Sequence, residues 1–171
     1  VTVISMGKED ETEALKHSLA MGCNEAVLVS DLALAGSDNV VAAKVLAAAI
    51  QNAADVDLVF FGKQAIDSDT GTLPAMVARV LGWPALTLVS TVSELSANGI
   101  KAERAIEEGR QVVESKLPAV LSITKDYGEP RYPSFMGIRK AARAEIPVWN
   151  LGELGIDAPA SVITWPELLN P

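Results

Sequence analysis

The stretch that decides the fold reads LVFFGKQAIDSDTGTLPAMVARVL and covers residues 58–81. It opens with an apolar, β-prone run that stops at Gly62, a pattern typical of a buried parallel strand. It closes with apolar side chains at i, i+3, i+4, i+7 and i+8 of residues 73–81, which predicts an amphipathic helix with Pro74 in its first turn and Gly82 at its end. A polar loop joins the two, so the segment is one strand–loop–helix unit of an α/β fold.

The chain before this unit repeats the same alternation. Strands are predicted at residues 1–6 and 25–30. The helix between them is expected to start at a capping box formed by Asp10 and Glu13. A second helix, capped by Asp38, is predicted at 39–54. This order predicts parallel βαβ units with right-handed crossovers.

The chain after this unit changes its pattern. Asn98-Gly99 is a strong signal for a hairpin turn. Strands are therefore predicted at 86–95, 100–106 and 111–116, as an antiparallel hairpin region, with a last apolar strand at 119–123. A short basic helix is predicted at 138–144. We expect one α/β domain over residues 1–146 and an irregular apolar arm over 147–171, which we expect to pack on a partner subunit.

The composition limits the function. The chain has 171 residues and a formal charge of −8, which argues against binding a nucleic-acid backbone. No apolar run reaches the roughly 18–20 residues needed to cross a bilayer. One cysteine and one histidine leave no set of ligands for a multi-cysteine metal site and no nucleophile–base pair, so we expect neither a metal nor an enzyme. Because Val1 falls inside a predicted strand, we expect further residues to precede it.

The loop between Gly62 and Leu73 is the candidate binding site. Ligands of open α/β sheets bind at the carboxyl ends of strands, and a helix start offers N–H groups and a positive dipole end to a phosphate. Thr70, Thr72 and Ser68 add hydroxyl donors, and Lys63 could add charge. Asp67 and Asp69 suit ribose hydroxyls, bracing of the loop, or a metal carried by a diphosphate. The glycine spacing matches neither common nucleotide motif, so a capped loop without a ligand is an equally good interpretation.

A second candidate is a basic and aromatic segment late in the chain. Its charged members are Lys125, Arg131, Arg139, Lys140 and Arg143, and its aromatic and apolar members are Tyr127, Tyr132, Phe135 and Met136. Arginine with aromatic side chains on an irregular loop favours a protein contact. The alternative is a solvated loop with one or two buried tyrosines.

Four strings in these regions identify a family resemblance. They are Gly62-Lys63-Gln64-Ala65-Ile66-Asp67-Ser68-Asp69-Thr70, Leu81-Gly82-Trp83-Pro84, Lys116-Leu117-Pro118-Ala119-Val120 and Glu129-Pro130-Arg131-Tyr132. In this order and spacing the chain resembles the β subunit of electron-transfer flavoproteins from Val1 to about Ile156. The family's chain is longer, with roughly one further strand and helix before the segment that matches Val1.

The resemblance implies a fold and a function. The fold would be a three-layer α/β/α domain with a mainly parallel sheet, of the adenine-nucleotide-hydrolase-like type, plus the hairpin region. The protein would pair with an α subunit that carries most of the FAD site, and pass electrons from flavin dehydrogenases to a quinone oxidoreductase or another acceptor. It would bind AMP, or a second FAD in the electron-bifurcating group, in the cytoplasm of a bacterium or archaeon or in the mitochondrial matrix.

The resemblance also implies site residues. The nucleotide-binding positions would be Met6, Gly62, Lys63, Gln64, Ala65, Ile66, Asp67, Ser68, Asp69, Thr70, Gly71, Thr72 and Leu73. The docking positions for partner dehydrogenases would be Tyr127, Glu129, Pro130, Arg131 and Tyr132. Tyr127 stands where the family commonly has an anchoring leucine, and Gly128 where it has asparagine, which predicts an unusual partner.

The motifs leave the nucleotide open. Asp69-Thr70 is closer to the electron-bifurcating group, whereas Gly82-Trp83-Pro84 is closer to the AMP group. The turn Ala105–Gly109 also departs from the family's usual sequence. The alternative function is a stand-alone adenine-nucleotide-binding module of the stress-protein or nucleotide-hydrolase type.

Overall fold

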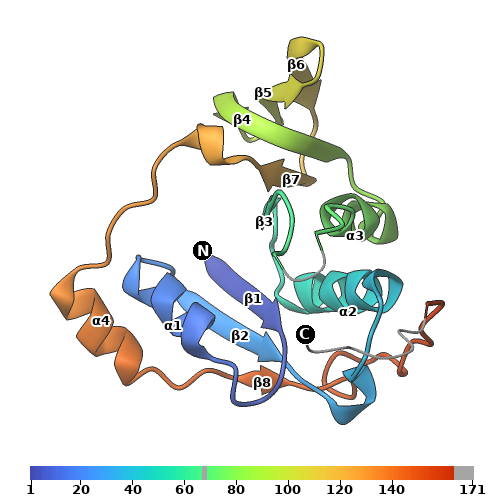
Figure 1. Cartoon of the computed structure of the whole chain (residues 1–171), viewed down its shortest axis with the longest axis vertical. Helices are drawn as coiled ribbons and strands as arrows, with labels where there is room; N and C mark the ends of the chain where they lie inside the picture. Colours follow the sequence, from blue (N-terminus) through green and yellow to red (C-terminus); the bar gives the residue numbers. More distant parts are fainter. Residues whose placement is uncertain (67–68, 164–171) are drawn as a thin grey trace, which may run out of the picture. The chain divides into compact units, whose positions relative to one another are not determined.

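The computed structural model describes residues 1–66 and 69–163. The chain forms two compact units (Figure 1). The first comprises Val1–Asn52 together with the chain from Pro130 onward, and the second comprises Ala53–Glu129. Each unit has its own sheet and its own apolar core.

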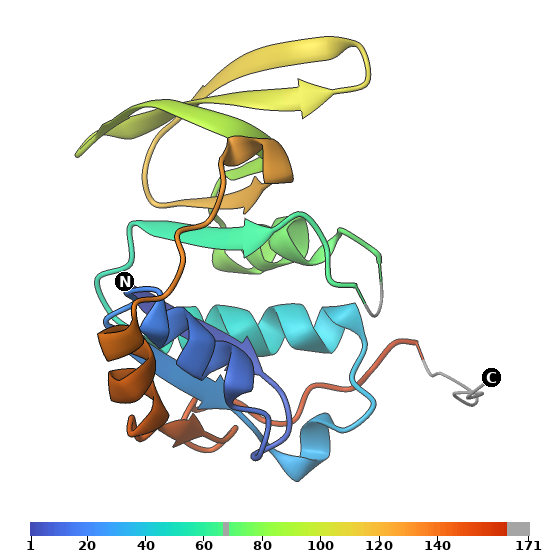
Figure 2. The ribbon, with the colours of Figure 1, turned by 60° about the vertical axis from the view of Figure 1, so that its left-hand side comes forward.

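The first unit is built on a short parallel sheet. Its strands are β1 (Thr2–Met6), β2 (Glu25–Val29) and β8 (Val148–Trp149), in the order β1-β2-β8. Its helices are α1 (Glu13–Ala20), α2 (Asn39–Asn52) and α4 (Phe135–Ala142), with a 3₁₀ turn η1 (Leu32–Leu34). Figure 2 shows α1 and α2 on opposite faces of this sheet, with α4 beside α1.

The alternation of side chains along β2 explains this layering. Successive side chains of a strand point to opposite faces. Val29 packs in a cluster with Val41 and Val45 of α2, whereas Leu28 packs with Leu15 of α1. The predicted α/β class with helices on both faces of a parallel sheet is confirmed. Helix α2 buries an Ala- and Val-rich surface on most of its sides, as its composition predicted.

Three local predictions in the first unit need correction. The basic helix predicted at 138–144 forms as α4 over Phe135–Ala142. Helix α1 begins at Glu13 after Thr12, and the predicted capping box between Asp10 and Glu13 is not formed. The nearby carboxylate of Glu11 instead accepts a hydrogen bond from the backbone N–H of Lys8. Helix α2 ends at Asn52 rather than at Ala54, because Ala54 already has a left-handed φ of 53°.

The second unit contains a five-stranded sheet. Its strands are β3 (Leu58–Gly62), β4 (Ala85–Ser96), β5 (Gly99–Ile106), β6 (Gly109–Ser115) and β7 (Ala119–Ile123), in the order β3-β7-β4-β5-β6. Strands β3, β7 and β4 are parallel, and β4, β5 and β6 form the predicted antiparallel region. The sequence order did not reveal that β3 pairs with β7 rather than with β1 or β2, because strand pairing is not a local property.

Helix α3 (Leu73–Leu81) has the predicted bounds. It buries Val77 and Ala78, and it ends at Gly82 in a left-handed conformation with φ of 72°. That conformation suits glycine at the C-terminal end of a helix. The strand–loop–helix unit that the sequence predicted therefore forms as β3, the loop and α3.

The beginning of the C-terminal arm packs on its own chain. Strand β8 pairs with β2, and Leu151 is buried among side chains of α2. The buried carboxylate of Asp38 caps α2 and also accepts hydrogen bonds from the backbone N–H groups of Val162 and Ile163, at 2.6 and 2.9 Å. Residues 164–171 lie outside the described part of the chain, and packing of the arm on a partner stays a prediction, as does the division at residue 146.

Candidate functional site

The candidate nucleotide loop runs from the carboxyl end of β3 to the start of α3. All its described residues from Gly62 to Thr72 are exposed, and Leu73 is half-buried where the helix begins. Asp67 and Ser68, which the motif includes, lie outside the described residues. The loop therefore presents its described side chains to solvent at the edge of the sheet where ligands of α/β proteins bind.

Internal hydrogen bonds brace this loop. The side-chain amide of Gln64 donates to the carboxylate of Asp69, and the backbone N–H of Asp69 donates to the carbonyl of Ala65 at 2.9 Å. Asp69 and Gly71 both have left-handed φ values, 49° and 59°. Asp69 acts as a brace in this structure, one of the three roles that its sequence position suggested.

The start of α3 has no side-chain cap from its own N-cap residue. Thr72 makes no capping hydrogen bond to the first turn, and Pro74 in that turn carries no N–H group. The Thr72 hydroxyl donates instead to Thr70 Oγ1 at 3.4 Å. The positive end of the helix dipole thus lies beside exposed residues, an arrangement that suits an anion.

Met6 lies in the other unit, at the end of β1. It is half-buried and packs against the apolar cluster between the sheet and α2. This packing accounts for a methionine at the position without a ligand. A role for Met6 in nucleotide binding stays a prediction.

The candidate docking segment passes from one unit to the other. In the second unit, Tyr127 ends a 3₁₀ turn, η2 (Lys125–Tyr127), and its side chain is 45% exposed; Glu129 is exposed as well. In the first unit, Pro130 and Arg131 are exposed, and Tyr132 is 96% exposed. The described segment therefore leaves its aromatic side chains unburied.

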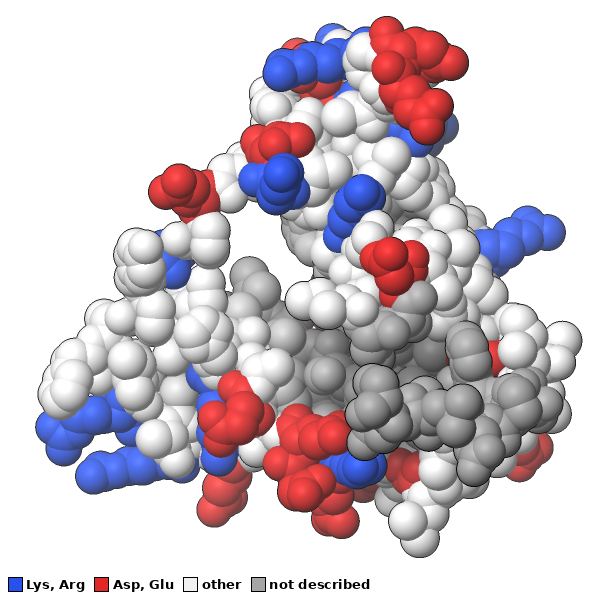
Figure 3. Space-filling model, viewed as in Figure 1, with Lys and Arg blue, Asp and Glu red and all other residues white. Residues whose placement is uncertain are grey.

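Helix α4 follows the docking segment along the chain, within the first unit. Its start is capped by the Ser134 hydroxyl, which accepts from the Gly137 N–H at 3.0 Å. A Cβ at Gly137 would stand 2.5 Å from the carbonyl oxygen of Ala20, so glycine is required for the close approach of α1 and α4. Phe135 and Met136 are exposed beside the basic residues of the last turn, and Figure 3 shows these blue side chains at the lower left, over α4.

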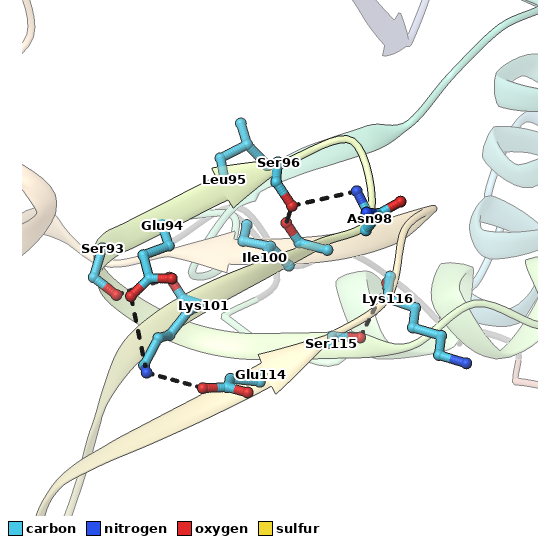
Figure 4. A pocket seen from close by; sticks show the side chains of 11 residues that line it. Ser93, Glu94, Leu95, Ser96, Asn98, Ile100, Lys101, Glu114, Ser115 and Lys116 are labelled. Carbon is cyan, nitrogen blue, oxygen red and sulfur yellow. Dashed lines mark hydrogen bonds and ion pairs between the residues drawn. The ribbon is translucent and has the colours of Figure 1, made fainter.

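A shallow concave surface lies elsewhere, in the hairpin region (Figure 4). It has a volume of about 850 Å³ and is lined by β4, β5 and β6. Lys101 Nζ lies there 2.9 Å from Glu114 Oε1 and 3.9 Å from Glu94 Oε1. The hydrogen bond and charge of Glu114, with the charge of Glu94, raise the pKa of Lys101. This half-buried, paired cation braces the hairpin and leaves the cavity without an unpaired charge from these three residues.

A second concavity of about 420 Å³ lies in the first unit among α1, β2, α4 and β8. Neither of these two cavities includes a residue of the candidate nucleotide loop or the docking segment. Among the described residues, no three His, Cys, Asp or Glu side chains are grouped so that they could hold a metal ion. None of the helices in the described ranges combines the length and the apolar character that a membrane span requires.

The sequence is similar to one family of proteins. Residues 1–154 match the family model described as the electron transfer flavoprotein domain. The chain is 40% identical over 158 residues to the electron transfer flavoprotein subunit beta of Thermoanaerobacterium thermosaccharolyticum, which covers 92% of this chain and 60% of that protein. The corresponding protein of Mycobacterium leprae is 38% identical over 157 residues, which cover 92% of this chain and 59% of that protein.

A third relative has a different name. The CarD subunit of the caffeyl-CoA reductase–Etf complex of Acetobacterium woodii is 38% identical over 160 residues, or 94% of this chain and 61% of that protein. The chain thus spans about three fifths of the length of the curated relatives it matches. The match with the family model extends over most of the chain, through both units. As its motifs predicted, the chain belongs to the electron transfer flavoprotein family, and its similarity is to the β subunits.

Proposed function

We propose that this chain acts as the β subunit of an electron-transfer flavoprotein, with an α subunit that carries most of the FAD site. The observation that carries the proposal is the match to the electron transfer flavoprotein domain over residues 1–154. The subunit would be an electron carrier rather than an enzyme. Bound FAD would accept and release the electrons, while this chain would set the distance and orientation for transfer.

The loop from Gly62 to Leu73 would bind the phosphate and ribose of an adenine nucleotide. Its exposure leaves room for a ligand, and the start of α3 would attract the phosphate. The hydroxyls of Thr70 and Thr72 and the ammonium of Lys63 are the polar groups of the described loop that suit phosphate oxygens. AMP and the adenosine half of FAD share this chemistry, so the same residues would serve either ligand.

The exposed segment around Tyr127 would dock flavin dehydrogenases. Aromatic side chains and arginine are enriched among residues that dominate protein interfaces. Tyr127 and Tyr132 provide exposed rings, and Arg131 provides a guanidinium. Its Nη1 lies near Gly22, 3.9 Å from the position that a Cβ on that glycine would take. The electrons would then pass to a quinone oxidoreductase or another acceptor.

Co-production of the full-length protein with the α subunit of the same organism tests the proposal. We expect a yellow 1:1 complex whose FAD is reduced by a flavin dehydrogenase. A colourless monomer with each α subunit tried would contradict it. Hydrolysis of ATP by the chain alone, abolished in Asp67→Ala or Thr70→Ala, would favour the nucleotide-hydrolase alternative instead.

Docking is tested separately with Tyr127→Ala in that complex. We expect weaker binding of the reducing dehydrogenase by about 2 kcal/mol or more, as for a buried interface aromatic. Val112→Ala, which shortens another exposed apolar side chain on β6, is the matched control and should leave affinity unchanged. A fall in melting temperature with unchanged affinity would mean that Tyr127 serves the fold rather than docking.

A further inference from the structure

Strand β4 contains a strained residue that no sequence motif marks. Leu88 has φ of 60°, in the left-handed region that side-chain-bearing residues rarely adopt. It lies in a bulge, because the pairs Leu86–Leu121 and Val89–Ile123 leave two residues of β4, Thr87 and Leu88, opposite one residue of β7, Ser122. Such strain persists only where surrounding contacts determine the conformation, and it is frequent at functional sites.

Side-chain hydrogen bonds from both neighbouring strands hold this bulge. The Leu88 N–H donates to Ser122 Oγ on β7 at 2.9 Å, and Ser122 is only 3% exposed. On the other side, Arg104 Nη2 on β5 donates to Thr87 Oγ1 at 2.8 Å. The Ser122 hydroxyl thus replaces the regular ladder partner that the bulge removes.

The bulge is connected directly to the candidate docking segment. The carbonyl of Val89, the residue after Leu88, accepts hydrogen bonds from both the N–H and the hydroxyl of Thr124, at 3.0 and 3.4 Å. Thr124 precedes η2, and its own carbonyl accepts from the N–H of Tyr127 at 3.1 Å. A continuous chain of contacts therefore runs from Ser122 through the bulge to Tyr127.

We propose that the bulge at Leu88, held by Ser122, positions Tyr127 for docking by turning the Val89 carbonyl toward Thr124. Ser122 is buried and Leu88 is half-buried, whereas Tyr127 is exposed. Ser122 and Leu88 would therefore act through Tyr127, as positioning residues. The bulged backbone would favour one orientation of η2 and so lower the cost of ordering the segment when a partner binds. This inference rests on the proposed docking role of Tyr127.

The test compares Ser122→Ala with Ser90→Ala in the full-length complex with the α subunit. Both serines are buried, at 3% and 7% exposed, and each loses one hydroxyl hydrogen bond. The Ser90 hydroxyl donates to the Glu103 carbonyl on β5 and has no such bond to β7 or η2. The two variants should therefore lose similar stability and differ only in their effect on η2.

Amide hydrogen exchange at Tyr127 is the direct readout. We expect exchange about fivefold faster in Ser122→Ala than in Ser90→Ala, as the loss of one hydrogen-bonded support implies. Affinity for a flavin dehydrogenase, chosen because it reduces the wild-type complex, should fall in Ser122→Ala and stay unchanged in Ser90→Ala. Equal exchange at Tyr127 in the two variants would overturn the positioning role.

The outcomes separate this inference from the docking proposal. If Tyr127→Ala weakens binding but Ser122→Ala changes neither exchange nor affinity, docking holds and positioning fails. If Ser122→Ala accelerates exchange but neither variant weakens binding, the bulge orders η2 but the docking role fails, and with it the inference.

A second pair of variants covers the case in which Ser122→Ala does not fold. Leu88→Gly introduces a residue that adopts positive φ without strain, so the bulge should be retained. Hydrogen exchange at the Tyr127 amide should therefore remain close to the wild-type rate. Leu88→Val places a β-branched residue there, which should destroy the bulge and accelerate that exchange. The same exchange rate in both variants would contradict the proposal.

Discussion

Helices α2 and α3 each begin after a strand and a loop, but their N-terminal ends are satisfied differently. At α2, the buried Asp38 carboxylate accepts from the Val41 N–H at 2.9 Å and also binds two amides of the C-terminal arm. At α3, Thr72 makes no capping bond and the preceding loop is exposed. The α2 start already holds an anion of its own chain, whereas the described residues before α3 are exposed, so of these two helix starts α3 is better suited to an anion from solution.

The largest effect on stability is expected at the start of α2, which Asp38 caps. Asp38→Ala removes the cap of α2 and the acceptor for Val162 and Ile163, so we expect a fall of several degrees in melting temperature. Asp69→Ala in the loop before α3 is the matched control, because it removes an exposed carboxylate. We expect a much smaller fall in its melting temperature. Equal falls by calorimetry would contradict the distinction between the two helix starts.

Two glycines, one before α2 and one before α3, test whether the loop before α3 binds a nucleotide. Gly71 and Gly36 have left-handed φ values of 59° and 71°, one before each helix. Alanine at either position should cost roughly 1 kcal/mol of folding stability, measured by urea unfolding. Only Gly71→Ala should reduce nucleotide affinity, because relief of the strain would shift the binding loop. We expect affinity to fall by about tenfold, which corresponds to about 1.4 kcal/mol of binding free energy. Loss of nucleotide in Gly36→Ala would show that the effect is general destabilisation.

The smallest effect concerns pH. Backbone hydrogen bonds, first from Val41 and then from Ile163, lower the pKa of the Asp38 carboxyl, although burial opposes them. The unfolded chain therefore binds the proton more readily, and stability rises with pH. The contribution is complete above the unfolded Asp pKa of about 3.9 and is lost as pH falls through the lower folded value.

Asp38→Asn is the variant for this test, because it retains a side-chain oxygen but cannot ionise. Unfolding followed between about pH 5 and pH 3 should show a steeper loss of stability in the wild type than in the variant. Parallel curves would mean that the carboxylate charge at the α2 start does not contribute in this range.

Local features of the fold could be predicted from the sequence, whereas non-local ones could not. The bounds of α3 and the meander after Ala85 follow from periodicity, Pro74, Gly82 and Asn98-Gly99, all within a few residues. The hydrogen bonds from Val162 and Ile163 to Asp38 join residues more than 120 positions apart. The sequence therefore predicted that Asp38 caps α2, but not that it binds the C-terminal arm.

The candidate sites show the same limit. The loop after β3 was recognisable because its motif is continuous, and the structure places its described residues in one exposed segment. The strain at Leu88 had no sequence signal, because leucine is an ordinary strand residue and its left-handed φ depends on Ser122 of another strand. A glycine or asparagine at that position would have indicated the bulge.

The most direct test of the account is the nucleotide content of the purified complex with its α subunit. Acid release and chromatography against AMP and FAD standards should give either one AMP and one FAD or two FAD per complex. After equal dialysis, Gly71→Ala should retain less of the second adenine nucleotide than the wild type while it keeps the α-subunit FAD. One FAD per complex with no second adenine nucleotide, or faster loss of the second nucleotide from the wild type than from Gly71→Ala, would contradict binding at the start of α3.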